Sequence, residues 1–292
     1  MTPMGYVLIL LAAVCWGLIG PVAKLAFREG MEPLEVAFWR AALGGVLFGA
    51  HAAWRRSGRV AREHLGVLVA FGLVGVTLFY GAYQLAVEQG GAALASVLLY
   101  TAPAWVAGMG VLWLGERLTP AKLVALGMTV LGVVGVALGG SAEVRPSVSA
   151  VGWGLVSGLA YALYYLFGKR YFERYDPALL YAYALPVGAV GLLPWVSFSA
   201  KTPVAWGALL GLVGVSTYLA YLLYAEGLKR VEATRASIVA TLEPVVAAVL
   251  AYVWWGERFG PLQYVGAGLI LAAVVVAVQG GRVSPRTERG AR

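Results

Sequence analysis

Ten long apolar runs, separated by short polar breaks, follow one another along the chain. They cover approximately residues 4–27, 33–54, 65–87, 92–114, 120–140, 149–168, 177–199, 204–225, 234–255 and 261–281. Each run is close to the 20 residues or so that a helix needs to cross about 30 Å of hydrocarbon. Apolar residues are continuous within the runs and lack the alternation of barrel strands, so the pattern predicts transmembrane helices. The short connections predict antiparallel neighbours.

The composition supports the bilayer as the natural solvent of this chain. Hydrophobic residues make up 61% and charged residues 12%, about half of the charged fraction typical of soluble proteins. We interpret the net charge of +8 as a mark of cytoplasmic loops and expect no nucleic-acid partner. A single cysteine, Cys15, excludes an internal disulfide. The start, "MTPMG", lacks a positive n-region, so the first run is interpreted as a retained helix.

The distribution of Lys and Arg predicts the orientation. With a cytoplasmic N-terminus, sixteen of the 22 Lys and Arg residues fall on the inner side, and Arg40 lies inside the second run. The five outer residues are Lys24, Arg28, Arg145, Lys201 and Arg258. By the positive-inside rule, both termini are then cytoplasmic, and we expect a multi-pass protein of the cytoplasmic (inner) membrane.

The second half of the chain repeats the first. Residues 80–140 and 221–281 align without a gap at a shift of 141 positions, with eighteen identities in sixty-one positions. The repeat predicts two five-helix units, 1–143 and 144–281, followed by a disordered cytoplasmic tail, 282–292. Since five is odd, the second unit must enter the membrane from the opposite side, as in the inverted repeats of secondary transporters. Two opposed copies offer an inward-open and an outward-open state of similar energy.

The most specific shared segment is a turn, "WLGERLTP" at 113–120 and "WWGERFGP" at 254–261. Glycine can end a helix in the left-handed conformation, and proline suits the first turn of the next helix. We therefore interpret the segment as hairpin architecture and not as a substrate contact. The predicted turn residues are Gly115, Glu116 and Arg117 on the cytoplasmic side, and Gly256, Glu257 and Arg258 outside.

These motifs resemble the EamA-like members of the drug/metabolite transporter superfamily. The resemblance extends to Trp16-Gly17 with a following Lys24, and to Pro33 ahead of Arg40, and it covers residues 4–281. It implies export or exchange of small metabolites, often amino acids. It also implies a basket of helices 1–4 and 6–9 around a central cavity, with helices 5 and 10 at the periphery.

Two charged residues lie inside the predicted helices. Charges within the hydrocarbon are costly and usually functional, which singles out Arg40 and Glu243. Their depths differ by roughly 6 Å at 1.5 Å per residue. One hypothesis is that they pair or that each faces the cavity; a structural salt bridge is the alternative. The protonation state of Glu243 is left open.

Further residues are predicted to line the cavity. Tyrosine offers a flat apolar face and a polar tip, which suits an amphipathic or aromatic solute. Serine and threonine can line the cavity or bond neighbouring helices. The candidates are Trp16, Tyr80, Tyr83, Ser96, Tyr100, Tyr161, Tyr165, Tyr221, Ser237 and Thr241. Trp54, Trp113, Trp206, Trp254 and Trp255 are assigned instead to the interfacial belt.

Pro103 and Pro244 hold equivalent positions in the fourth and ninth helices. Proline removes an intrahelical hydrogen bond, and such breaks in transporters mark the binding region or a hinge. We predict a hinge role, with a purely structural kink as the alternative.

The sequence holds no catalytic constellation. Its histidines, His51 and His64, belong to no metal-spaced cluster, and there is no nucleotide loop. We therefore expect no enzyme and no cofactor, but a secondary active or facilitative exporter of small metabolites. Amino acids, particularly apolar or aromatic ones, are the first expected substrates, and a proton is the candidate coupling ion. The alternative is a non-transporting sensor or lipid-handling scaffold.

The predicted oligomeric state is a monomer or a weak homodimer. Gly135 and Gly139 form a small-xxx-small pair of the kind found in helix dimers. Because glycine is common in this chain, such pairs also arise by chance.

Overall fold

The computed structural model describes residues 3–138, 147–256, 258 and 260–282, with the backbone alone at 281 and 282. Within these residues the chain is helical and contains no strand. The first half holds α1 (Pro3–Gly17), α2 (Ile19–Arg28), α3 (Pro33–Trp54), α4 (Arg62–Gly72), η1 (Leu73–Leu78), α5 (Phe79–Gly90), α6 (Ala92–Leu99), α7 (Ala102–Leu114) and α8 (Pro120–Leu138). The second half holds α9 (Val148–Tyr171), α10 (Pro177–Leu192), η2 (Leu193–Trp195), α11 (Pro203–Gly211), η3 (Leu212–Leu219), α12 (Ala220–Leu228), α13 (Ala233–Ala240), α14 (Glu243–Trp255) and α15 (Pro261–Arg282).

These elements join into ten helical spans long and apolar enough to cross a membrane, which confirms the helices predicted from hydropathy. The third span begins at Arg62, three residues before the predicted start, and the seventh ends at Trp195 instead of 199. The seventh is shorter because the chain after Trp195 turns to bind the first half. There Ser199 donates from its backbone and hydroxyl to the buried carboxylate of Glu35, which also pairs with Lys201.

Helix irregularities recur at the spacing of the sequence repeat. The fourth span breaks at Tyr100–Thr101 between α6 and α7, and the ninth breaks 141 residues later at Thr241–Leu242. The third and eighth spans carry matching π-helical segments, η1 and η3. The two halves therefore share local backbone detail as well as helix number.

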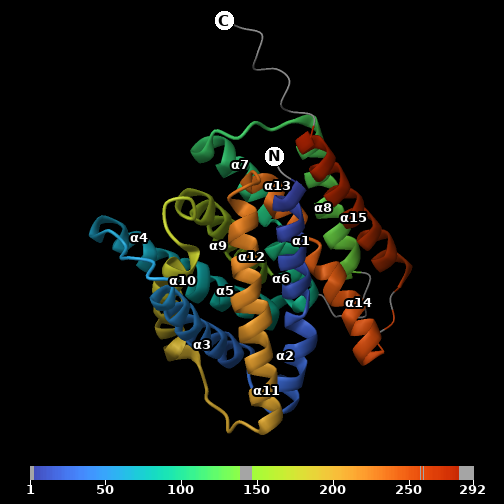
Figure 1. Ribbon diagram of the computed structural model, residues 1–292. Helices are drawn as coiled ribbons and strands as arrows, with labels where there is room; N and C mark the ends of the chain where they lie inside the picture. The colour runs from blue at the N-terminus through green and yellow to red at the C-terminus, as the bar shows by residue number, and fades with distance from the viewer. Residues whose placement is uncertain (1–2, 139–146, 257, 259, 283–292) are drawn as a thin grey trace, which may run out of the picture.

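The two ends of the molecule can be told apart by their contacts (Figure 1). The starts of α1 and α13 meet near Gly5 and Val231, and the end of α15 lies beside Arg235. We name this the N-terminal end. At the opposite end, Lys24 and Arg28 of α2 lie over the ring of Trp255 at the end of α14. The α7–α8 turn lies at the N-terminal end and the α14–α15 turn at the opposite end, as an inverted repeat requires (Figure 1). Membrane sidedness stays a prediction.

The helices pack in pairs that exchange the two halves. The spans α1–α2 and α11–α12 lie together with α14, while α9 packs against α5, α6 and α7. Each set thus combines one half's first span with the other half's third and fourth. The α3–α10 and α8–α15 pairs complete the fold, and α8 and α15 lie side by side at the periphery (Figure 1).

Glycines allow the close approach of α8 and α15. A Cβ atom on Gly266 would lie 2.5 Å from the carbonyl oxygen of Gly132, closer than real Cβ contacts come. Gly135 faces Gly266 in the same contact. Gly135 therefore packs inside the chain and is not available to a homodimer, which corrects that suggestion. Gly139 and the predicted tail from 283 onward lie outside the described residues.

Candidate functional site

A cavity of about 490 Å³ lies between the two halves. Its walls come from α1, α2, α3, η1, α5, α6, α9, α12 and α14. The lining reaches Phe27, Pro33, Val87 and Ala92, all at helix ends on the opposite end of the molecule. It includes no residue of α7 or α13 within the described chain. The cavity therefore opens at the opposite end and is closed at the N-terminal end.

Nine of the twelve predicted cavity residues are among the lining residues. They are Trp16, Arg40, Tyr80, Tyr83, Ser96, Tyr100, Tyr161, Tyr221 and Glu243. They come from both halves, so the fold gathers into one chamber side chains that are distant in sequence. Contact with a substrate stays a prediction for each of them.

The other three, Tyr165, Ser237 and Thr241, do not line the cavity. Tyr165 is buried behind the wall and donates its hydroxyl to that of Tyr161 at 3.2 Å. The Ser237 and Thr241 hydroxyls donate to carbonyl oxygens three residues earlier on their own helix. Helical phase alone did not separate these positions from cavity-facing ones, because α13 packs against neighbours on every side.

Arg40 is held by one side of its guanidinium. Its Nε donates to the Thr217 hydroxyl at 3.2 Å, and its guanidinium lies 6.0 Å from the ring centre of Tyr80. Among the described residues, Nε makes its only hydrogen bond. The two terminal nitrogens of a buried cation are thus left for a partner that enters the cavity.

Glu243 is the first residue of α14, directly after the break in the ninth span. Its carboxylate lies close to the Tyr100 hydroxyl, and a carboxylate at a helix N-terminus is favoured by the helix dipole. No ion pair joins it to Arg40 in the described structure. Of the two arrangements expected from the sequence, each charge facing the cavity is the one observed.

Aromatic side chains form the floor of the cavity toward the N-terminal end. Tyr164 stacks on Tyr224 with ring centres 5.2 Å apart, and Trp16 lies 5.3 Å from Tyr224. The Tyr164 and Tyr181 hydroxyls are 2.6 Å apart, and Tyr181 lies 4.9 Å from Tyr221. Flat rings packed this closely leave no path for a solute.

Pro103 and Pro244 each lie at the second residue of a helix, α7 and α14, just after the breaks. They therefore sit where no intrahelical donor is lost, and the interruptions precede them. The breaks are observed; a hinge motion stays a prediction.

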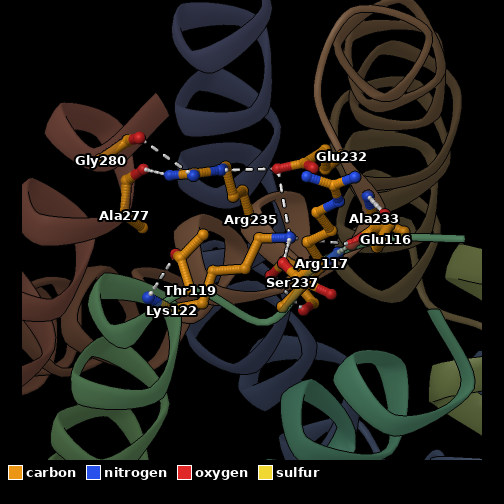
Figure 2. Close-up of polar contacts among 11 residues, drawn as sticks. Glu116, Arg117, Thr119, Lys122, Glu232, Ala233, Arg235, Ser237, Ala277 and Gly280 are labelled. Atoms are coloured by element: carbon orange, nitrogen blue, oxygen red, sulfur yellow. Dashed lines mark hydrogen bonds and ion pairs between the residues drawn. The ribbon is translucent and has the colours of Figure 1, made fainter. Parts of the chain in front are cut away.

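The repeated turns have the predicted backbone. Gly115 and Gly256 end α7 and α14 with left-handed φ values of 67° and 65°, and Pro120 and Pro261 begin α8 and α15. Glu257 lies outside the described residues, and Arg258 is exposed. Glu116 does more than the sequence indicated: it accepts hydrogen bonds from the backbone of Ala233 and Thr234 in the other half (Figure 2).

Some of the tryptophans assigned to the interfacial belt face elsewhere. Trp54, Trp113 and Trp254 are exposed on the surface, as that assignment expects. The ring of Trp255 instead lies under the Lys24 and Arg28 side chains, so that assignment is wrong for it. Trp206 packs edge-on against Trp39, with ring centres 5.4 Å apart.

Ten spans in two repeats around a chamber of solute size define a multi-pass helical membrane protein of the secondary-transporter type. The chain matches the EamA-like transporter family over residues 3–138 and 148–279, once in each half, and belongs to that family. Its relatives are called transporters, not enzymes.

Relatives from several organisms extend the likeness. An uncharacterized transporter of Archaeoglobus fulgidus is 32% identical over 94% of this chain and 96% of its own length. A "probable terminal-alkyne amino-acid exporter" of Streptantibioticus cattleyicolor is 26% identical over 92% of this chain and 91% of its own. A solved crystal structure covers 97% of this chain and 99% of its own with a TM-score of 0.83 at 16% identity, which shows a shared fold.

Proposed function

We propose that this protein exports small zwitterionic metabolites, foremost apolar or aromatic amino acids, across the cytoplasmic membrane by alternating access. The observation that carries the proposal is the arrangement of Arg40 and Glu243. Both charges face one cavity, and no ion pair joins them. A solute carrying its own positive and negative groups can satisfy both at once.

The geometry suits an α-amino acid. The free terminal nitrogens of Arg40 match a carboxylate in the bidentate manner, and Glu243 matches an ammonium group. Tyr80, Tyr83 and Tyr161 surround these charges with flat apolar faces. A cavity of about 490 Å³ has room for an aromatic side chain between them.

Two further observations support the proposal. The amino-acid exporter from Streptantibioticus cattleyicolor matches this chain over nearly its whole length. The floor of rings under the cavity closes one end while the other is open, the asymmetry that a transport cycle needs. Charge distribution supports the cytoplasmic membrane, with the N-terminal end inside.

Counterflow in proteoliposomes tests the function. Vesicles loaded with unlabelled phenylalanine should accumulate radiolabelled phenylalanine transiently, because a carrier exchanges solute across the bilayer without net energy. Phenethylamine and 3-phenylpropionate, which each lack one of the two charges, should compete at least tenfold more weakly, since each leaves a desolvated charge unpaired. Protein-free vesicles are the control.

The same assay separates the proposal from the scaffold alternative. Absence of counterflow for a panel of apolar, aromatic, polar and basic amino acids would contradict amino-acid transport. Equal competition by all three phenyl compounds would contradict recognition of both charges.

A further inference from the structure

The two halves differ in one contact that the repeat relates. A shift of 141 residues turns α6 into α13 and α7 into α14, so the contact of α13 with α7 corresponds to that of α6 with α14. The helices α7 and α13 pack extensively at the N-terminal end, whereas α6 and α14, both wholly described, are nearly apart. The closed and the open end of the cavity are therefore two forms of one contact.

A cluster of four charged side chains fastens the closed form (Figure 2). Glu116, in the turn after α7, accepts from the backbone N–H of Ala233 at 2.5 Å and of Thr234 at 3.2 Å. Lys122 of α8 lies 3.5 Å from Glu116 and 3.3 Å from Glu232, just before α13. A carboxylate that receives the first free N–H groups of a helix is well placed by both hydrogen bonding and the helix dipole.

The remaining contacts of the cluster stay within one half. The Arg235 Nε donates to Glu232 at 2.7 Å, and its other nitrogens donate to the carbonyl oxygens of Ala277 at 2.6 Å and Gly280 at 3.1 Å. Lys122 donates to the Arg117 carbonyl oxygen at 2.8 Å. These bonds hold each half of the cluster to its own repeat.

The cluster therefore divides into two neutral pairs. When α13 leaves the α7–α8 turn, Glu116 keeps Lys122 and Glu232 keeps Arg235. Only the Lys122–Glu232 pair and the two backbone bonds of Glu116 are broken. No charge is left without a counter-charge, so the contact is reversible in a way that a lone buried ion pair is not.

Burial makes the closed form strong. The side chains of Lys122 and Arg235 are 1% and 2% exposed, so water screens their interactions little. The Thr234 hydroxyl beside them is buried without a hydrogen-bond partner. Such an unsatisfied group is unusual in a permanent contact and suits one that is remade during a cycle.

The sequence confines this cluster to one end. At the shift of 141 residues, the counterpart of Lys122 is Gln263, that of Glu232 is Gly91, and that of Arg235 is Leu94. The corresponding contact at the opposite end cannot form these ion pairs. An interaction present in only one of two related states shifts the population toward that state.

We propose that Glu116, Lys122 and Glu232 form an ionic latch that closes the cavity at the N-terminal end and biases the empty protein toward the conformation open at the opposite end. The latch rests on the proposed transport cycle, in which this end must open to load or release solute. It is a property of the contact between α7, α8 and α13 and does not depend on which solute is carried.

Thiol labelling of the purified protein tests the latch without any transport assay. Ser237 lies one turn along α13 from Ala233 and is 1% exposed, so a Ser237→Cys reporter in a Cys15→Ser background is shielded while the latch is closed. Glu116→Gln and Lys122→Gln should each raise its rate of reaction with N-ethylmaleimide by about tenfold or more, the factor expected for loss of a charge-assisted hydrogen bond. Lys122→Gln also copies the residue at the opposite end.

Two controls make the result specific. Glu226→Gln removes a carboxylate that pairs with Lys229 and Arg230 at the same end but outside the latch, and it should leave the rate unchanged. A Ser157→Cys reporter, equally buried in α9, should stay unreactive in every latch variant. Unchanged labelling of Ser237→Cys in both variants would overturn the proposal. Equal acceleration at Ser157→Cys would also overturn it, because the effect would then be general loosening of the fold.

Discussion

A disulfide across the closed end should stop transport completely and reversibly. A Cβ atom on Gly110 of α7 would lie 3.3 Å from the Thr234 hydroxyl oxygen of α13. Disulfides join Cβ atoms about 3.5–4.5 Å apart, so Gly110→Cys/Thr234→Cys in a Cys15→Ser background should oxidise readily. Because α7 and α13 must separate for solute to pass this end, phenylalanine counterflow should vanish on oxidation and return on reduction.

The single variants serve as the matched controls. Gly110→Cys and Thr234→Cys alone carry the same changes in volume and polarity but cannot form the cross-link, so oxidant should leave their transport unchanged. Full counterflow by the oxidised double variant, with the disulfide verified by mass spectrometry, would show that α7 and α13 need not part.

Replacing Arg40 should have the second large effect. Arg40→Met keeps much of the side-chain length and removes the charge that faces Glu243 across the cavity. Losing one partner of a desolvated charge pair costs about 2–5 kcal/mol, so transport efficiency should fall by at least about thirtyfold. The measurement is the initial rate of phenylalanine counterflow over a range of concentrations.

Two further substitutions sharpen that result. Arg40→Lys retains a charge without the bidentate fork and should recover only part of the activity. Thr217→Val removes the hydroxyl that holds the Arg40 Nε, so it should raise KM more than it lowers the maximal rate. Wild-type kinetics in Arg40→Met, or equal competition by 3-phenylpropionate in both proteins, would remove Arg40 from carboxylate recognition.

The helices could be predicted from the sequence because the bilayer imposes their length. All ten spans were located within a few residues, since each must satisfy its backbone internally over the same thickness. The exception, the end of the seventh span, depends on a tertiary contact with Glu35 that hydropathy does not encode.

The candidate site was predictable only in part. Arg40 and Glu243 stood out because charge inside hydrocarbon is rare, and the structure brings both to one cavity. Ser237 and Thr241 were placed there wrongly because helical position does not reveal which face meets a neighbouring helix. The π-helical segments η1 and η3 carry no local signature in the sequence and were missed.

The latch residues were also missed, although part of the signal was present. Glu116 was noted within the repeated turn, but its partner groups are backbone N–H donors of α13, which no side-chain pattern identifies. Lys122, Glu232 and Arg235 lie at predicted helix ends, where charges are common. Their departure from the repeat, against Gln263, Gly91 and Leu94, was the available clue.

Access to one cavity residue from both membrane faces tests alternating access most directly. Ser96 lines the cavity, and a Ser96→Cys thiol can be probed with a membrane-impermeant reagent in right-side-out and inverted vesicles. Alternating access predicts labelling from both faces in the reduced Gly110→Cys/Thr234→Cys background, and from the opposite-end face alone after oxidation. Labelling from a single face in both redox states would contradict alternating access, and so would labelling from both faces after oxidation.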